Sequence, residues 1–211
     1  MRFVFLQNFD PKIAKYTTNN LPLQELSKSY PTIFIASGDG SCLNKFYHKP
    51  IIVSSKANYQ LDKLNLAIKF FSNFDNYDII IRTCIDAVIM DFGMLKKIVE
   101  EEVDPLKPIL MGNRQCQNAP DNKTNARIKW IRGGCQLWTK PMVHQLKGNT
   151  IKYKRNNDWD MPLTYEVKKR DVTIINRALF ELNDKWTGVA PVWHPKSNKF
   201  TNFMGNIRGG R

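Results

Sequence analysis

Short, continuously apolar runs alternate with amphipathic segments through the first two thirds of the chain. The apolar runs predict buried strands at residues 2–7, 32–36, 51–53, 78–82, 109–111 and 134–137. Apolar residues three or four positions apart predict helices at 59–71, 91–101 and 171–182, the last with Asp171 as its N-cap. Because the strand runs are apolar throughout, helices should cover both faces of the sheet. The pattern therefore predicts an α/β, Rossmann-like fold, with a mainly parallel central sheet flanked by helices in a single domain over residues 1–211.

The remaining stretches are polar and weakly periodic. Residues 112–130 and 148–168 are rich in Asn and Lys and are predicted to be long loops, which are usually functional. Residues 198–211 carry little apolar core, so we expect the chain to be the first domain of a longer polypeptide. The apolar start is too short for a signal peptide, and no run approaches the roughly 18 residues of a membrane span. A cytoplasmic protein without a transmembrane segment is expected.

Positive charge is concentrated in the second half of the chain. The formal net charge is +13, and residues 1–105 carry 12 basic and 12 acidic side chains. Residues 106–211 carry 20 basic and 7 acidic ones, so the whole excess lies there. Such a field attracts an anion, which can be a nucleic acid, a membrane surface or a phosphorylated small molecule. We interpret 1–105 as a nucleotide-binding half and 106–211 as a half that binds the acceptor and a diphosphate.

Several well-defined motifs are absent from the sequence. The segment Gly38-Asp39-Gly40 lacks the third glycine of a dinucleotide fingerprint, and the chain has no P-loop. It also has no nucleophile elbow and no His-Glu-x-x-His zinc motif. Its four cysteines are scattered without a close pair, which argues against a structural zinc site. Dehydrogenase, P-loop and serine-hydrolase functions are therefore disfavoured.

Two polar residues stand where a metal ion is plausible on chemical grounds. Asp86 lies between two apolar runs, where a carboxylate is costly to place without a cation or hydrogen-bond donors. It offers a hard oxygen ligand to Mg²⁺ or Mn²⁺, although a turn-capping role would also explain it. His194 follows a predicted strand and precedes Lys199 by five residues. A histidine and a lysine at this spacing can present a metal ligand and a phosphate-binding cation together.

Four segments resemble parts of the GT-A glycosyltransferases, in particular the retaining galactosyltransferase and glycogenin-like branch, and the first three named here occur in the order of that branch. Cys84-Ile85-Asp86 is similar to the Asp-x-Asp metal motif of that branch, with only the second Asp present. Asp171-Val172-Thr173-Ile174-Ile175-Asn176 is similar to its Asp-Gln-Asp-Ile-Leu-Asn segment. His194-Pro195-Lys196-Ser197-Asn198-Lys199 resembles its His-x-Gly-x-x-Lys motif, with Lys196 in place of glycine. Gly133-Gly134-Cys135-Gln136 is similar to the small-residue segment beside its sugar pocket.

The resemblance implies a glycosyltransferase that moves a sugar from a UDP-sugar donor to a glycan or glycoprotein acceptor. Over its whole length the chain also resembles chlorovirus enzymes that build a capsid glycan, which implies a viral acceptor in the host cytoplasm and a deoxyhexose such as rhamnose, or a hexose, as the sugar. Mn²⁺ or Mg²⁺ is the implied cofactor, and retention the implied outcome. Cys84 in place of the first Asp weakens the expected affinity for hard cations, because a thiol is a poor ligand for them.

Candidate site residues follow from the resemblance and from the positions of polar residues after the strands. The metal ligands are Asp86 and His194. The donor-binding candidates are Asn8, Asp39, Lys63, Arg82, Gly133, Gly134, Gln136 and Lys199. The catalytic candidates are Asp171, near the reacting carbon of the sugar, and Asp158 or Asp160, either of which can serve an inverting enzyme as general base.

Two other functions remain open from the sequence. A nucleic-acid-binding or nuclease domain would explain the basic half and predicts salt-sensitive binding, but no helix-turn-helix or RNA-binding aromatic signature is present, so no nucleic-acid partner is expected. A non-catalytic glycan-binding module would bind glycans without donor turnover.

Overall fold

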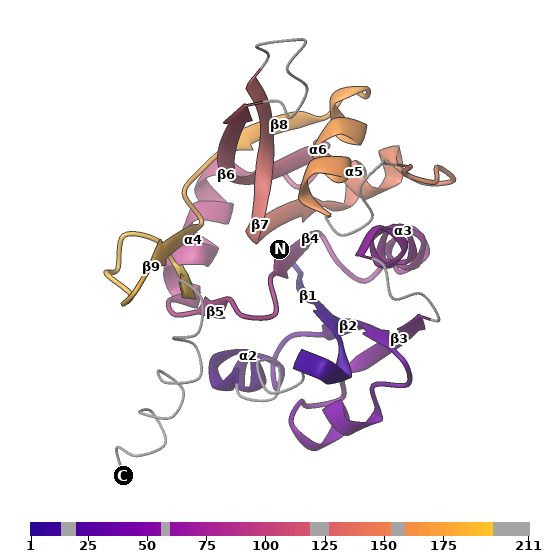
Figure 1. The fold of residues 1–211 in the computed structure, drawn as a ribbon, viewed down its shortest axis with the longest axis vertical. Helices are drawn as coiled ribbons and strands as arrows, with labels where there is room; N and C mark the ends of the chain where they lie inside the picture. Colours follow the sequence, from indigo (N-terminus) through magenta and orange to yellow (C-terminus); the bar gives the residue numbers. More distant parts are fainter. Residues whose placement is uncertain (14–19, 56–59, 119–126, 153–158, 196–211) are drawn as a thin grey trace.

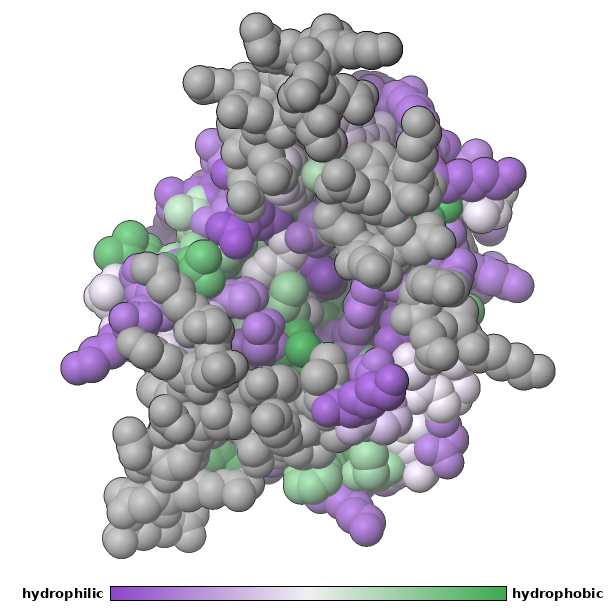
Figure 2. Space-filling view, in the orientation of Figure 1, coloured by the Kyte–Doolittle hydropathy of each residue, from purple (hydrophilic) through white to green (hydrophobic). Residues whose placement is uncertain are grey.

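The computed structural model describes residues 1–13, 20–55, 60–118, 127–152 and 159–195. These residues form one large sheet and one small sheet, with helices packed around them (Figure 1). Hydrophilic side chains cover most of the described surface on the face shown in Figure 2, and apolar side chains form only small patches there. No helix in the described ranges is long and apolar enough to cross a membrane.

The large sheet has seven strands among the described residues, in the order β3-β2-β1-β4-β7-β6-β8. Four neighbouring pairs are parallel, and β7 runs antiparallel to both of its neighbours. The carboxyl ends of β1, β2, β3 and β4 therefore meet at one edge. The strands are β1 (Phe3–Phe9), β2 (Thr32–Ser37), β3 (Ile51–Ser55), β4 (Ile79–Thr83), β6 (Ile109–Asn118), β7 (Arg127–Thr139) and β8 (Thr173–Asn176).

A small sheet lies beside the large one and carries part of the candidate site. In the described part of the chain it contains β5 (Val88–Ile89), β10 (Val192–Pro195) and β9 (Phe180–Asn183), in that order. β10 pairs antiparallel with β5 and parallel with β9. Because β5 follows β4 after a short turn, this pairing brings the end of the described chain back to the carboxyl edge of β4.

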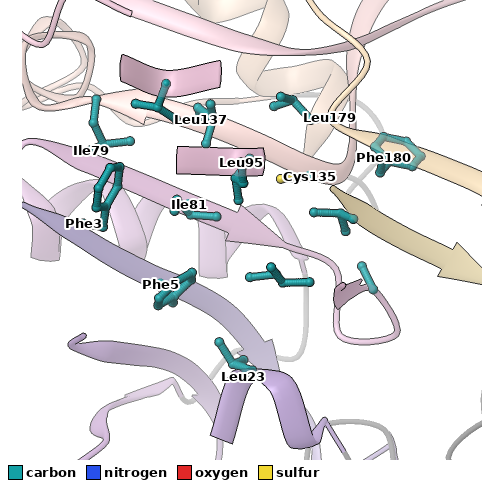
Figure 3. Close-up of a cluster of buried hydrophobic side chains, with 14 of the residues drawn as sticks. Phe3, Phe5, Leu23, Ile79, Ile81, Leu95, Cys135, Leu137, Leu179 and Phe180 are labelled. Atoms are coloured by element: carbon teal, nitrogen blue, oxygen red, sulfur yellow. The ribbon is translucent and has the colours of Figure 1, made fainter. Parts of the chain in front are cut away.

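Helices cover both faces of the large sheet. Alternating residues of β1 show the division: Phe3 and Phe5 belong to one buried cluster, and Val4 and Leu6 belong to the other. The first cluster packs under α2 and α4 and is drawn in Figure 3. The second packs under α3, α5 and α6. The helices are α2 (Leu21–Leu26), α3 (Gln60–Phe71), α4 (Phe92–Glu102), α5 (Lys140–Gln145) and α6 (Asp160–Lys168), with 3₁₀ turns at Pro11–Ile13 and Ser41–Lys45.

The predicted α/β fold, with a mainly parallel sheet flanked by helices, is confirmed. The helix predicted at 171–182 is wrong, because this segment forms β8 and β9. Its run of β-branched residues, from Val172 to Ile175, favours a strand, and the apolar spacing that suggested a helix spans two strands separated by a bend. Asp171 is exposed and caps no helix.

The two long loops predicted at 112–130 and 148–168 are also partly wrong. Residues 112–118 and 127–130 extend β6 and β7 beyond the short runs expected from their apolar cores. Residues 160–168 form α6, whose amphipathic pattern is weak because its buried positions include Pro162 and Thr164. Polar composition in both cases hid regular structure that tertiary pairing stabilises.

Candidate active site and metal centre

A cavity of about 240 Å³ lies at the carboxyl ends of β1 and β4. Ligands of open α/β sheets bind at this edge, in the crevice beyond the strand ends. Polar side chains from four segments line it: Asn8 from β1, Lys63 from α3, Arg82 from β4 and Asp160 from α6. Four residues that the sequence singled out separately are thus brought together at one position.

Arg82 and Asp160, which both line this cavity, form an ion pair. The Arg82 Nη1 atom lies 3.0 Å from the Asp160 Oδ1 atom, and their side chains are only 8% and 20% exposed. The same Nη1 donates a hydrogen bond of 2.7 Å to the carbonyl oxygen of Gly133. The Gly133 N–H in turn donates to Asp160 Oδ2 at 2.5 Å. The guanidinium, the carboxylate and the backbone N–H and carbonyl groups of Gly133 in β7 therefore hold one another in place.

Gly133 and Gly134 lie inside β7 rather than before a strand, and each is close to a different part of the site. A Cβ atom on Gly133 would collide with Arg82 Nη1 and with both carboxylate oxygens of Asp160. A Cβ atom on Gly134 would meet the Phe180 ring at 2.7 Å. Glycine is needed at both positions because the site approaches the backbone so closely.

One aromatic side chain, Trp159, and one amide side chain, Gln136, pack around the ion pair. The ring of Trp159 lies 5.0 Å from the guanidinium carbon of Arg82. Gln136 is fully buried, donates to the Ile131 carbonyl at 3.0 Å and accepts from the Trp138 indole at 3.1 Å. Gln136 therefore supports the cavity from the core, and it does not line it.

Two buried polar atoms of cavity-lining residues have no hydrogen-bond partner among the described residues. They are the indole nitrogen of Trp159 and the Oδ1 of Asn8, although Asn8 donates to Gln60 through its amide at 2.6 Å. Leaving such groups unpaired costs free energy unless water or a ligand satisfies them. The cavity thus offers a donor and an acceptor to a polar ligand.

Lys63 is the least expected lining residue, since only 1% of it is exposed. Its Nζ donates to the Phe9 carbonyl at 3.4 Å, which is a long hydrogen bond. Burial lowers the pKa of Lys63, and the charge of Asp10 opposes this shift. A buried lysine beside a cavity is the kind of group that an anionic ligand would stabilise.

Two residues that line the cavity, Cys84 and Asp86, converge with His194 as potential metal ligands. Cys84 and Asp86 follow β4, and His194 lies within β10, where the sequence had predicted a polar turn. The Cys84 Sγ, an Asp86 oxygen and a His194 ring nitrogen all lie within 4.8 Å of one another. The His194 Nε2 and Asp86 Oδ1 atoms are 3.3 Å apart. The sulfur, oxygen and nitrogen donors fit a divalent transition-metal ion and fit Mg²⁺ poorly, because Mg²⁺ prefers six oxygens.

Cys84 also contacts the peptide that orients Arg82. Its Sγ donates a hydrogen bond of 3.0 Å to the Gly133 carbonyl oxygen, which also accepts from Arg82. Burial raises the pKa of the Cys84 thiol to about 12. The thiol is therefore protonated in the absence of a metal ion. The Gly133 carbonyl oxygen also links the Cys84–Asp86–His194 group to the Arg82–Asp160 ion pair, because it accepts from both Cys84 and Arg82.

Other sequence candidates lie elsewhere. Asp39 is exposed on the turn after β2, where it accepts a hydrogen bond of 3.1 Å from the Ser41 N–H, and it does not line the cavity. Asp171 precedes β8, whose first residue pairs with Ile109 at the opposite edge of the sheet from the cavity. We therefore do not propose Asp171 as a sugar ligand. Lys199 and Asp158 lie outside the described residues.

The sequence analysis missed Gln60 and the thiol of Cys84 as contributors, and it did not select Trp159 as a site residue. Trp159 stands between Asp158 and Asp160, two residues that were chosen as candidates, so its neighbours were the available signal. Gln60 opens α3, and no sequence pattern points to it. Cys84 was interpreted as a defect in a metal motif, whereas the structure places its sulfur among the donors.

A larger cavity of about 490 Å³ lies between α3 and the turn after α5. Its lining includes two lysines, Lys69 and Lys147, but no acidic, histidine or cysteine side chain. Although this cavity is larger than the one at the strand ends, the combination of acidic, basic and metal-ligating groups favours the smaller one.

Comparison with known proteins supports the fold and leaves the function open. No family model matches the chain, and no curated protein matches it by sequence. Among solved structures it is similar to the mannosyltransferase PcManGT from Pyrobaculum calidifontis in complex with GDP-Man and Mn²⁺, with 14% identity and a TM-score of 0.55. The match covers 83% of this chain and 54% of that one, so the chain spans about half the length of that enzyme.

A weaker similarity, with 9% identity and a TM-score of 0.49, is to a CMP:2-keto-3-deoxy-manno-octonic acid synthetase complexed with CTP, over 84% of this chain and 90% of that one. This second similarity is too distant to bear on function. The first shows that the chain has a GT-A-like α/β fold.

Proposed function

We propose that this chain is the catalytic domain of a glycosyltransferase that uses a nucleoside-diphosphate sugar as donor. One observation carries the proposal: a cavity lined by a buried lysine and an Arg–Asp pair is also lined by Cys84 and Asp86 of the Cys–Asp–His cluster, at the ligand-binding edge of a GT-A-like sheet. The positive groups suit an anionic part of a ligand, and the carboxylate suits a part that carries several hydroxyl groups.

The positive groups suit a diphosphate leaving group. When the glycosidic bond of the donor breaks, negative charge develops on the diphosphate, and fixed positive groups stabilise it without reorganisation. Lys63 and Arg82 both line the cavity and are held in place by packing and hydrogen bonds. A divalent ion held by Asp86 and His194 would supply further stabilisation of the same charge.

Asp160 suits binding of the donor sugar better than removal of a proton. Its carboxylate already accepts from Arg82 and from the Gly133 N–H, and one fifth of its side chain remains exposed at the cavity. A carboxylate oxygen can accept more than one hydrogen bond, so the exposed part of Asp160 can also contact sugar hydroxyls. We therefore assign Asp160 to sugar positioning, which agrees with the retaining outcome implied by the resemblance.

The cavity volume suggests how the donor is divided over the surface. About 240 Å³ is less than the volume of roughly 300–1,000 Å³ typical of complete ligand sites. We infer that the cavity takes the sugar and diphosphate, and that the nucleoside lies along the carboxyl ends of β1 and β2, near Asn8 and Asp39. UDP is the nucleotide that the family resemblance favours, and a capsid glycan in the host cytoplasm is the acceptor that it suggests.

Thermal unfolding of the protein with UDP, GDP and dTDP, each with and without Mn²⁺, tests the proposal. A ligand at a hundred times its dissociation constant adds about 2.7 kcal/mol of stability, which is a clear shift. We expect one nucleotide to stabilise the protein, more so with Mn²⁺, and Asp86→Ala to abolish the effect of the metal.

A single-stranded oligonucleotide at low salt is the control for the basic second half. If it stabilises the protein while all three nucleotides fail, the transferase proposal is overturned in favour of a nucleic-acid-binding domain.

A further inference from the structure

The candidate metal ligands Cys84, Asp86 and His194 offer sulfur, oxygen and nitrogen, whereas Mg²⁺ is bound best by oxygen alone. We propose that Cys84, Asp86 and His194 together bind a borderline-soft divalent ion, such as Zn²⁺ or Co²⁺, in strong preference to Mg²⁺. The inference rests on the proposed function only for the role of the ion in catalysis, because metal binding itself requires no nucleotide sugar.

Geometry supports one ion shared by the three side chains. In a four-coordinate site with a metal–sulfur distance of about 2.3 Å and metal–nitrogen and metal–oxygen distances of about 2.0–2.2 Å, neighbouring donors are roughly 3.3–3.8 Å apart. The Nε2–Oδ1 distance of 3.3 Å already fits, and the three donor atoms lie within 4.8 Å of one another. Side-chain rotations that move the donors by about 1 Å would complete the site.

The identity of the donors sets the preference. Thiolate and imidazole ligands favour Zn²⁺, Co²⁺ and Fe²⁺, whereas carboxylate and water favour Mg²⁺ and Ca²⁺. Two of the three donors here, the Cys84 sulfur and the His194 nitrogen, belong to the first group. Mn²⁺ should fall between Zn²⁺ and Mg²⁺, because it accepts nitrogen but gains little from sulfur.

Binding exchanges one proton for one ion. The Cys84 thiol donates to the Gly133 carbonyl, so the sulfur–hydrogen bond breaks as the sulfur–metal bond forms, and the proton passes to the solvent. The Gly133 carbonyl keeps its hydrogen bond from Arg82, so it is not left without a partner. Three protein donors leave at least one coordination position open, which is typical of a catalytic site.

Cobalt(II) absorption spectroscopy of the metal-stripped protein tests the proposal without any substrate. We expect Co²⁺ to give tetrahedral visible bands and a near-ultraviolet thiolate-to-cobalt charge-transfer band. Zn²⁺ should displace Co²⁺ stoichiometrically, and Mg²⁺ should fail to do so at a hundredfold excess. Cys42→Ser, which removes an exposed thiol outside the cluster, should keep the band.

Two substitutions at the sulfur position make the test specific. Cys84→Ser should abolish the charge-transfer band and weaken Co²⁺ binding at least tenfold. Cys84→Asp should also lose the band while binding Mn²⁺ more tightly than the parent protein. Circular dichroism of each variant establishes that it is folded. Absence of the band in the parent protein, its persistence in Cys84→Ser, or equal displacement by Mg²⁺ and Zn²⁺ would overturn the proposal.

The outcomes separate this inference from the proposed function. A protein that binds a nucleotide but shows no charge-transfer band retains the transferase proposal and loses this one. A protein that shows the band but binds no nucleotide has the metal site without the proposed donor.

Discussion

Removal of the Asp160 carboxylate tests whether its ion pair with Arg82 holds the cavity together. Asp160→Ala leaves the guanidinium buried, with its 2.7 Å bond to the Gly133 carbonyl and its contact with the Trp159 ring. Breaking a buried pair by removing one partner costs about 3–5 kcal/mol. The carboxylate is 20% exposed and the carbonyl bond survives, so we expect a loss at or below the lower limit of that range, about 2–3 kcal/mol.

Asp160→Asn separates charge from hydrogen bonding in the same position. The amide oxygen can still accept from the Gly133 N–H, so this variant should lose about 1–2 kcal/mol. Urea unfolding measures both losses, and an unchanged slope against urea would show that the same surface is exposed.

Glu100→Ala is the matched control, because it removes a carboxylate from a half-exposed helix pair with Lys96. It should change the free energy of unfolding by less than about 0.5 kcal/mol. If Asp160→Ala were no more costly than this control, the Arg82–Asp160 pair would not organise the site.

Three further predictions follow from individual residues. Lys63→Met should raise the free energy of unfolding by about 1–2 kcal/mol, because a buried ammonium with one long hydrogen bond among the described residues is costly. The same variant should bind nucleotide about tenfold more weakly. Lower stability of the variant in urea unfolding would contradict this prediction. Gly133→Ala should weaken nucleotide binding, measured by calorimetry, far more than Gly148→Ala in an open turn, since only the first added Cβ meets the ion pair. The hydrogen bond from Arg2 lowers the pKa of Asp78 below its ordinary 3.8, so its stabilisation is present above that pH and is lost as the pH falls through the folded-state pKa. Unfolding measured between pH 2 and pH 6 should therefore show an acid-side loss that is smaller in Arg2→Ala, and identical curves would refute it.

Most of the core strands and helices could be predicted because runs of apolar residues and capping residues mark them in the sequence itself. The runs that became β1, β2 and β4 are apolar on both faces, as expected for strands covered on both sides. α4 begins next to Asp91, whose side chain accepts from the Met94 N–H at 2.8 Å, so its start was readable from a capping residue. Residues 171–182 misled because helical spacing of apolar residues arose from two short strands.

The candidate site depended on contacts that no local pattern carries. Arg82 and Asp160 are 78 positions apart and meet only because β4 pairs with β7 and α6 packs on β7. Asp86 and His194 were selected together through a family resemblance, and the pairing of β5 with β10 explains why they converge. Physical reasoning from spacing alone would have left these four residues unconnected.

Cys84 shows how a departure from a motif changes meaning in three dimensions. In the sequence it is the loss of an acidic ligand, which weakens binding of hard cations. In the structure its sulfur lies beside Asp86 and His194, and it shares the Gly133 carbonyl with Arg82. We therefore expect the cysteine to change the preferred metal ion of the proposed site, with its sulfur as one of the ligands.

Release of nucleoside diphosphate from a panel of UDP-, GDP- and dTDP-sugars, at a saturating divalent ion, tests the central claim most directly. The account predicts cleavage of one nucleotide sugar, slowed about a hundredfold by Asp86→Ala and unchanged by Lys169→Ala, which removes an exposed lysine side chain. Failure of the folded, metal-loaded protein to cleave any nucleotide sugar in the panel would contradict it.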